Sequence, residues 1–180
     1  LPIFIPIRCF TCGLILASKY KKYFKLMNSS VLIIKTKDKT VTVTNKEKKL
    51  KLTDSICHYG FNRHCRIRIK DLLSFSSGLK WKETYEASNN LHESDVMNML
   101  FGKARSNILD FIINHPLEFK PGYQWYYSSA DTNLIMGVLH YIYGMKDPDF
   151  PFTKLFNPLG INSVTWQRDS QGVYIGASSL

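Results

Sequence analysis

The fold is decided by residues 120–144, "KPGYQWYYSSADTNLIMGVLHYIYG", in which a turn, a row of hydroxyl side chains and an apolar segment follow one another. Pro121-Gly122 has the residue order that a tight turn prefers. Asp131 is expected to cap a helix that runs to Gly144, because short acidic side chains cap helices and glycine ends them. The apolar residues of this helix have the spacing of one buried face: Leu134, Val138, Tyr141 and Ile142.

Four consecutive hydroxyl side chains, Tyr126-Tyr127-Ser128-Ser129, separate the turn from the helix. A segment that only packs in a core has no need of them, whereas a catalytic loop does. The alternative is that both tyrosines are amphipathic core residues at the start of the helix, with Ser128 or Ser129 as its cap. Taken alone, the row favours this alternative, but the motifs around it, described below, favour the catalytic interpretation.

Short elements are expected around this helix. Residues 31–44 have the β-branched residues of a hairpin with a turn at 37–39. The expected helices are 53–59, 67–73, 95–101 between Ser94 and Gly102, and 107–115 with Ser106 as the cap. Residues 74–81, "SFSSGLKW", are expected to form a loop, and residues 164–176 two short strands.

Charge is distributed unevenly along the 180 residues. Of 24 lysines and arginines, 16 lie in residues 1–70 beside 3 acidic residues, which gives +13. Residues 71–180 hold the other 8 and 11 acidic residues, which gives −3, and the sum is the net charge of +10. A basic half of this kind either contacts nucleic acid or membrane, or marks two segments of different origin. We find little motif support for a nucleic-acid partner and expect none.

The cysteine content does not indicate a disulfide-rich scaffold, since the chain has only Cys9, Cys12, Cys57 and Cys65. Its apolar opening, residues 1–18, is broken by Arg8 and two prolines, so we expect no transmembrane segment. A secretory signal has a basic segment before its apolar region, and no such segment precedes these residues. The compartment therefore stays open. Because the chain starts without Met and stops at Leu180, we expect it to be part of a longer protein.

Four stretches follow one another in an order that resembles the serine β-lactamase, penicillin-binding protein and esterase-like hydrolase superfamily. They are "KLKLTDSICHY" (49–59), "IRIKDLLSFSSGLKW" (67–81), "PGYQWYYSSADTN" (121–133) and "LFNPLGINSVTWQRDSQGVYIGASSL" (155–180). The third is similar to the family's P-G-x-x-x-x-Y-S-N loop, and its form is most similar to the 6-aminohexanoate-oligomer hydrolase branch. The resemblance implies a helical region packed on an antiparallel sheet, of which this chain would hold less than half.

The resemblance also implies an acyl-enzyme mechanism, in which a serine attacks an acyl carbonyl and a lysine at i+3 takes its proton. The family's tyrosine corresponds to Tyr127 and its usual asparagine to Ser129, a substrate-binding position. Ser18 and Lys21 form the better placed S-x-x-K string, although a lysine-rich stretch produces this string by chance. The other string, from Ser77 to Lys80, falls where the family has no nucleophile. The family's K-T-G or H-x-G strand would lie beyond residue 180.

The first residues resemble a different family. "IPIRCFTCGLILASKYKKYFKLM" (5–27) is similar to the opening of the small zinc-binding RNA polymerase subunits, archaeal subunit N and its eukaryotic relatives. The resemblance implies a four-ligand zinc site, for which the candidates are Cys9, Cys12, His64 and Cys65, with Cys57 nearby. Thiolates and one imidazole suit zinc. The alternative is an incomplete C-x-x-C segment.

The sequence therefore predicts two parts: a basic segment of uncertain origin at 1–47, and a partial serine-hydrolase domain of the α+β class at 48–180, mainly helical with few strands. Its substrate would be a small-molecule ester or amide, and its hydrolase chemistry needs no cofactor. The expected activity of the 180 residues themselves is weak or absent. The alternatives are a non-catalytic, zinc-binding subunit of RNA polymerase and a fused or decayed gene product.

Overall fold

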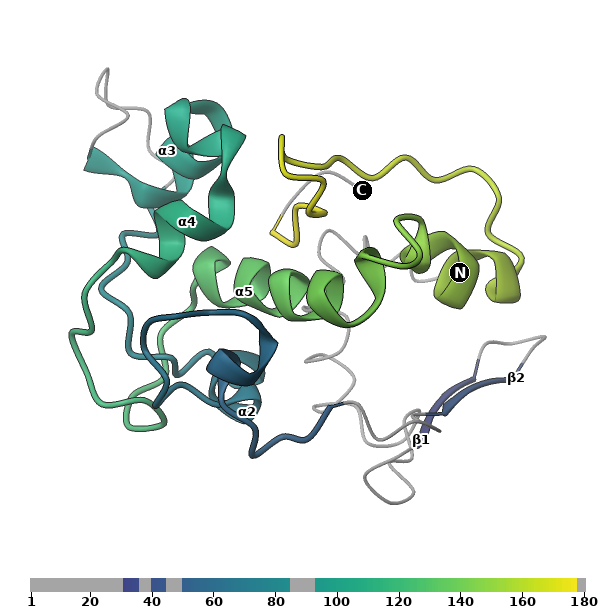
Figure 1. Ribbon diagram of the computed structural model, residues 1–180, viewed down its shortest axis with the longest axis horizontal. Coiled ribbons are helices and arrows are strands. Elements are labelled where there is room, and N and C mark those ends of the chain that lie inside the picture. Colours follow the sequence, from purple (N-terminus) through teal and green to yellow (C-terminus); the bar gives the residue numbers. More distant parts are fainter. Residues whose placement is uncertain (1–30, 36–39, 45–49, 85–92, 178–180) are drawn as a thin grey trace, which may run out of the picture.

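The computed structural model describes residues 31–35, 40–44, 50–84 and 93–177. Strands β1 (Val31–Lys35) and β2 (Thr40–Thr44) pair antiparallel, which confirms the predicted hairpin. They form the only sheet within the described ranges, and the rest of those residues is mainly helix and loop (Figure 1). The predicted predominance of helix is confirmed, while the α+β class is not confirmed by these residues.

Helix α5 (Ser129–Leu139) runs through the middle of the described region (Figure 1). Every residue from Ser129 to Val138 is buried, so the helix has no solvated face. The predicted stripe is correct at Leu134 and Val138 but wrong at Tyr141, which is 54% exposed. A one-sided stripe is typical of a surface helix, whereas a helix packed on all sides is apolar all round.

The start of α5 also differs from the prediction. Ser128 is the residue before the helix, so Asp131 lies inside the first turn and is not its cap. After Leu139 the chain continues in a wider turn, His140–Gly144 (η4), and Gly144 ends this segment as expected. An acidic residue in a first turn is favourable because the helix dipole is positive there.

Two short elements precede the loop at 74–81. Ile56–Tyr59 (η1) is capped by Ser55, whose Oγ accepts a hydrogen bond from the Cys57 amide at 3.1 Å. Helix α2 (Ile69–Leu73) lies within the predicted range and has an acidic residue, Asp71, in the first turn. Both elements contact α5.

Two helices after residue 93 form close to where they are predicted, one with the predicted cap and one with a different cap. Helix α3 (Asp95–Phe101) lies between Ser94 and Gly102, and Ser94 Oγ accepts from the Met97 amide at 3.2 Å. A short turn, Lys103–Ser106 (η3), leads to helix α4 (Ile108–Ile113). Its cap is Asn107 and not the predicted Ser106, because Asn107 Oδ1 accepts from the Asp110 amide at 3.2 Å.

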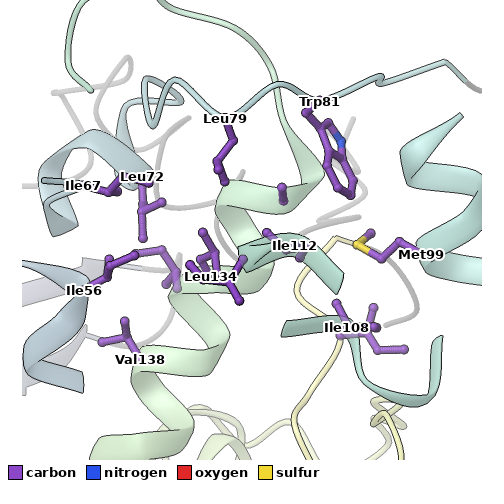
Figure 2. Close-up of a cluster of buried hydrophobic side chains, with 14 of the residues drawn as sticks. Ile56, Ile67, Leu72, Leu79, Trp81, Met99, Ile108, Ile112, Leu134 and Val138 are labelled. Atoms are coloured by element: carbon purple, nitrogen blue, oxygen red, sulfur yellow. The ribbon is translucent and has the colours of Figure 1, made fainter. Parts of the chain in front are cut away.

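Two hydrophobic clusters pack against α5. Figure 2 shows the first, in which Leu134 and Val138 of α5 meet Ile56, Leu72 and Ile112. The second cluster contains Met136 of the same helix together with the aromatic residues of the C-terminal part: Phe150, Phe156, Trp166 and Tyr174. That part includes the turns η5 (Phe152–Phe156) and η6 (Asn157–Leu159). Burial of aliphatic and aromatic side chains is the main stabilising contribution here.

The segment around Gly176 packs directly on α5. A Cβ at Gly176 would lie 2.8 Å from the Thr132 carbonyl oxygen, so only glycine fits. The Gly176 amide donates to Asn133 Oδ1 at 2.9 Å. The two strands predicted at 164–176 are reduced to a single bridge between Arg168 and Tyr174.

Candidate active site

Two loops lie side by side at the start of α5. We call residues 74–81 the serine-glycine loop and residues 120–128 the tyrosine loop. The Gly122 amide donates to the Ser76 carbonyl at 2.7 Å, and the Tyr126 amide donates to the Phe75 carbonyl at 2.8 Å. These bonds fix the tyrosine loop by its backbone, so its side chains remain available for other contacts.

Gly78 is required where the serine-glycine loop meets the segment before the tyrosine loop. Its carbonyl accepts from the amides of Glu118 and Phe119, at 2.8 and 3.1 Å. Its φ is +78°, and a Cβ would lie 2.3 Å from the Phe119 carbonyl oxygen. Any side chain at this position would both strain the backbone and separate the two segments.

Phe75 is held in an unusual backbone conformation, with φ +52°. Its ring is buried and lies against the Tyr127 ring, at a centroid distance of 5.1 Å. Non-glycine residues with positive φ cost energy and are common at functional sites. This conformation of Phe75 accompanies the contact between its ring and the Tyr127 ring.

Asp131 connects α5 to the serine-glycine loop. Ser77 Oγ donates to Asp131 Oδ1 at 2.5 Å, and the Ser77 amide donates to Oδ2 at 3.3 Å. Burial raises the pKa of Asp131 to about 7, although hydrogen bonds from Ser77 oppose this. Charge on Asp71 adds to the rise. Asp131 is thus a buried carboxyl group that titrates near neutral pH.

Glu83 holds the first residue of α5. It accepts from the Ser129 amide at 2.8 Å, from Ser129 Oγ at 2.5 Å and from Trp81 Nε1 at 2.7 Å. A carboxylate at a helix N-terminus also interacts favourably with the helix dipole. Ser129 is 1% exposed, so its hydroxyl is directed toward Glu83 in the protein interior.

A cavity of about 220 Å³ lies between the two loops. Its polar lining includes Ser77, Gln124 and Ser128, and its aromatic lining includes Trp81 and Tyr126. Ser128 is buried and its Oγ has no hydrogen bond of good geometry within the described residues, although it is close enough to Asp131 to favour the charged carboxylate. The cavity is small and has a mixed polar and aromatic lining.

The two tyrosines are more similar than the sequence suggests. Tyr126 is 44% exposed and Tyr127 is 37% exposed, so neither is a buried core residue as the alternative interpretation expected. Tyr126 lines the cavity, whereas Tyr127 packs on Phe75. The aromatic residue that anchors this region is Phe75, from the other loop.

The predicted nucleophile pair, Ser18 and Lys21, lies outside the described residues. Ser77 of the second S-x-x-K string donates to Asp131. Among pairs of described residues, no serine hydroxyl is hydrogen-bonded to a lysine amine.

Of the predicted zinc ligands, Cys9 and Cys12 also lie outside the described residues. Cys65 is bonded to Cys57 in a disulfide, with a Cα–Cα distance of 5.2 Å. A sulfur in a disulfide is not a thiolate, so Cys65 does not offer its donor atom in this state. His64 Nε2 is hydrogen-bonded to the His115 carbonyl at 2.8 Å. Within the described part of the chain no three metal-ligating side chains gather, and the described residues do not fit a zinc ion as they stand.

The sequence model of the family described as Beta-lactamase matches residues 40–180. The chain belongs to this family. Both loops described above lie within the matched range, and so does α5. The family includes serine hydrolases, so the loops form part of a serine-hydrolase-related domain.

A comparison with curated proteins also finds relatives whose names describe hydrolases. Proteins described as "Putative D-alanyl-D-alanine carboxypeptidase" from Salmonella paratyphi B, Salmonella newport and Salmonella agona are each 28% identical to the chain over 107 residues. The matched region is 59% of this chain and 23% of each relative. The chain therefore spans about a quarter of the length of these relatives.

A second family model, described as RNA polymerases N / 8 kDa subunit, matches residues 4–65. Both predicted resemblances are thus confirmed. The two matched ranges overlap at residues 40–65. Among the described helices none is long and apolar enough to span a membrane.

Sequence reasoning missed Glu83, Phe75 and the role of Asp131. Their signal is weak, because Glu83 lies 46 residues before Ser129 and Asp131 lies 54 residues after Ser77. A positive φ at a phenylalanine has no signal in composition or spacing. Only the tertiary structure brings these residues together.

Proposed function

We propose that the chain is part of a serine hydrolase that acts on esters or amides through an acyl-enzyme. The observation that carries this proposal is the tyrosine loop, whose backbone is fixed by the serine-glycine loop while the Tyr127 ring remains partly exposed. A catalytic side chain needs both properties, since it must be held in place and still reach a substrate.

In this proposal Tyr127 transfers the proton between the nucleophile and the leaving group. A phenol ordinarily titrates near pH 10, so a nearby cation is needed for it to act as a base at neutral pH. Lys21 is the proposed cation and Ser18 the proposed nucleophile. The serine oxygen would bond to the acyl carbon, and its proton would pass through Tyr127 to the departing alcohol or amine.

Ser129 is proposed to act indirectly on substrate binding. Its hydroxyl donates to Glu83, and this bond fixes the start of α5 beside the cavity. The cavity side chains that face a substrate would then be Gln124, Tyr126 and Ser128.

For the substrate, the relatives' printed name favours an amide bond to a terminal D-alanine. A small ester is the second substrate class. The cavity of about 220 Å³ holds a small acyl group and leaves the rest of a substrate in solvent. The 180 residues alone are expected to turn over esters weakly or not at all, because a missing oxyanion donor costs a rate factor on the order of 10²–10³.

The experiment measures burst kinetics with nitrophenyl esters and release of D-alanine from a D-Ala-D-Ala peptide. It uses the 180-residue chain and a form lengthened by its flanking coding sequence. In the active form, Tyr127→Phe should reduce turnover by about 10²–10⁴, the usual contribution of a general acid–base group. Tyr141→Phe is the matched control, because Tyr141 is 54% exposed and lies outside both loops, and it should change turnover by less than about tenfold. Full turnover by Tyr127→Phe would contradict the proposal.

A second candidate function is supported by the family model that matches residues 4–65: a zinc-binding, non-catalytic subunit of RNA polymerase. A fusion of two genes would also produce two family matches that meet at residues 40–65. In this candidate function zinc binding by Cys9, Cys12, His64 and Cys65 requires reduction of the Cys57–Cys65 disulfide.

The zinc proposal is tested by metal analysis of protein purified with and without reductant. Reduced protein should hold about one equivalent of zinc, and Cys12→Ser should release it. A zinc content no higher than the background of the measurement in the reduced protein would exclude the zinc site.

A further inference from the structure

A second cavity, of about 620 Å³, lies at the beginning of the tyrosine loop, at residues 120–123. Its walls are the segment before and at the start of α2 and the turn at residues 120–123. The side chains that define its chemistry are Arg66, Arg68, Lys70, Lys120, Asp71 and Tyr123. We call it the cationic cavity, because four of these six side chains carry a positive charge.

The alternation of the sequence "RIRIK" produces one wall of this cavity. Ile67 and Ile69 are completely buried in the core. Arg68 has an extended backbone conformation, with φ −107° and ψ 160°. Burial of the isoleucines on both sides of the extended Arg68 leaves its side chain directed outward. Arg66, in the turn before Ile67, and Lys70, in the first turn of α2, are exposed as well.

The position of this wall is fixed at several points. The Cys57–Cys65 disulfide holds its start, and the Ile67 amide donates to the His64 carbonyl at 2.8 Å. The Lys70 amide donates to the Leu52 carbonyl at 3.0 Å. The cations therefore project from a rigid backbone, which reduces the entropy cost of binding a ligand.

The opposite wall is the turn that starts the tyrosine loop. The Tyr123 amide donates to the Lys120 carbonyl at 3.0 Å, and Gly122 has φ +81°. A Cβ at Gly122 would lie 3.2 Å from Asp71 Oδ1, so glycine lets the turn come close to α2. Tyr123 is 78% exposed and offers a phenol group at the rim.

The cavity's one carboxylate is already engaged. Asp71 is 4% exposed, and its Oδ2 accepts from the Arg68 backbone amide at 2.9 Å. Within the described ranges, none of the four cationic side chains forms a salt bridge. Four cations and one carboxylate leave the cavity with a net positive charge, and an anion would relieve the mutual repulsion of the cations.

We propose that the cationic cavity binds a small molecule with two or more linked phosphate groups. Arginine guanidinium groups bind phosphate oxygens in pairs, and lysines add point charges. The volume exceeds what one phosphate needs, and the balance of four cations and one carboxylate, +3, is opposite in sign to a diphosphate and close to it in size. Such a ligand would connect α2 to the turn of the tyrosine loop. Binding does not depend on hydrolase activity.

The test is titration calorimetry at moderate salt on the 180-residue chain, with inorganic pyrophosphate as the probe. Adenosine diphosphate and sulfate are compared with it. Pyrophosphate should bind at least about tenfold more tightly than sulfate, because linked phosphates contact both walls. Tighter binding of adenosine diphosphate would identify a nucleotide source, and equal binding would show that the diphosphate group is sufficient.

The variant Arg66→Gln/Arg68→Gln should weaken pyrophosphate binding at least about tenfold. Lys154→Gln removes an exposed charge far along the sequence and should change it less than about twofold. Equal binding of sulfate and pyrophosphate, or no effect of the double variant, would overturn the proposal. A twelve-nucleotide single strand that binds tightly and is not displaced by pyrophosphate would also overturn it, in favour of a nucleic-acid surface.

Discussion

The start of α5 and the cationic cavity share the tyrosine loop but use polar side chains in opposite ways. At the start of α5, Glu83 and Asp131 are hydrogen-bonded and hold two loops together. In the cationic cavity, Arg66 and Arg68 are exposed and form no salt bridge with a described residue. Polar groups in the interior contribute to folding, whereas unpaired charges at the surface are available for ligands. The predictions below test this difference, from the largest expected effect to the smallest.

The largest effect is expected from titration of Asp131. Its folded pKa of about 7 lies above the ordinary value of 3.8 for an aspartate, so the folded state holds the proton more tightly. The contribution of Asp131 to the free energy of unfolding should therefore be largest below about pH 4. It should fall by about 2–4 kcal/mol as the pH rises to about 7. Asp131→Asn should flatten this slope in urea unfolding measured from pH 4 to 8.

For Asp131, an unchanged slope in Asp131→Asn would show that the carboxyl group is not responsible. Asp147→Asn is the matched control, because Asp147 lies in the turn after η4 and is only partly buried. It should leave the slope over this pH range nearly unchanged.

The next effect is expected at Glu83. Glu83→Ala removes the acceptor for two donors of Ser129 and one of Trp81, and leaves them buried. The free energy of unfolding should fall by about 2–3 kcal/mol. Glu118→Ala removes an exposed carboxylate nearby and should cost less than about 0.5 kcal/mol. Equal values for the two variants in urea unfolding would contradict this account.

A smaller effect is expected for the ion pair between His115 and Asp95, whose Nε2–Oδ1 distance is 3.2 Å. The hydrogen bond to Asp95 raises the pKa of His115, and burial opposes it. The pair therefore stabilises the fold fully below about pH 6.5 and less as the pH rises through the folded pKa. His115→Gln should cost about 1 kcal/mol at pH 5.5 and less at pH 9. His58→Gln, at an exposed histidine, should show no such difference.

The smallest effect is expected from the cations of the cavity. Arg66→Gln/Arg68→Gln should change the free energy of unfolding by less than about 0.5 kcal/mol. Arg105→Gln is the contrast, because Arg105 donates to the Leu100 carbonyl at 2.9 Å and to Gln167 Oε1 at 2.7 Å. Its loss should cost about 1 kcal/mol. A large destabilisation by the double variant would show that these arginines hold the fold.

Sequence patterns predicted most elements because their signals are local. Ser94 and Gly102 bound α3 as expected, since caps act over one turn. The predicted stripe was wrong at Tyr141 because α5 ends at Leu139, and in the wider turn η4 that follows, the α-helical spacing no longer places residues on the buried face. The disulfide between Cys57 and Cys65 and the bond of Glu83 to Ser129 depend on pairings that spacing alone does not give. The zinc set and the Ser18–Lys21 pair remain predictions.

The close packing of Gly176 on α5 has a consequence for synthesis on the ribosome. Helix α5 contacts Ile56 on one side and the Gly176 segment on the other. A nascent chain that has just completed α5 therefore exposes the apolar side of Met136 until about forty more residues emerge. Contacts between distant segments slow folding, and exposed apolar surface favours aggregation in the interval. Folding of this region is expected to begin only after the segment around Gly176 has emerged, and a chain stopped before residue 173 should be a substrate for chaperones.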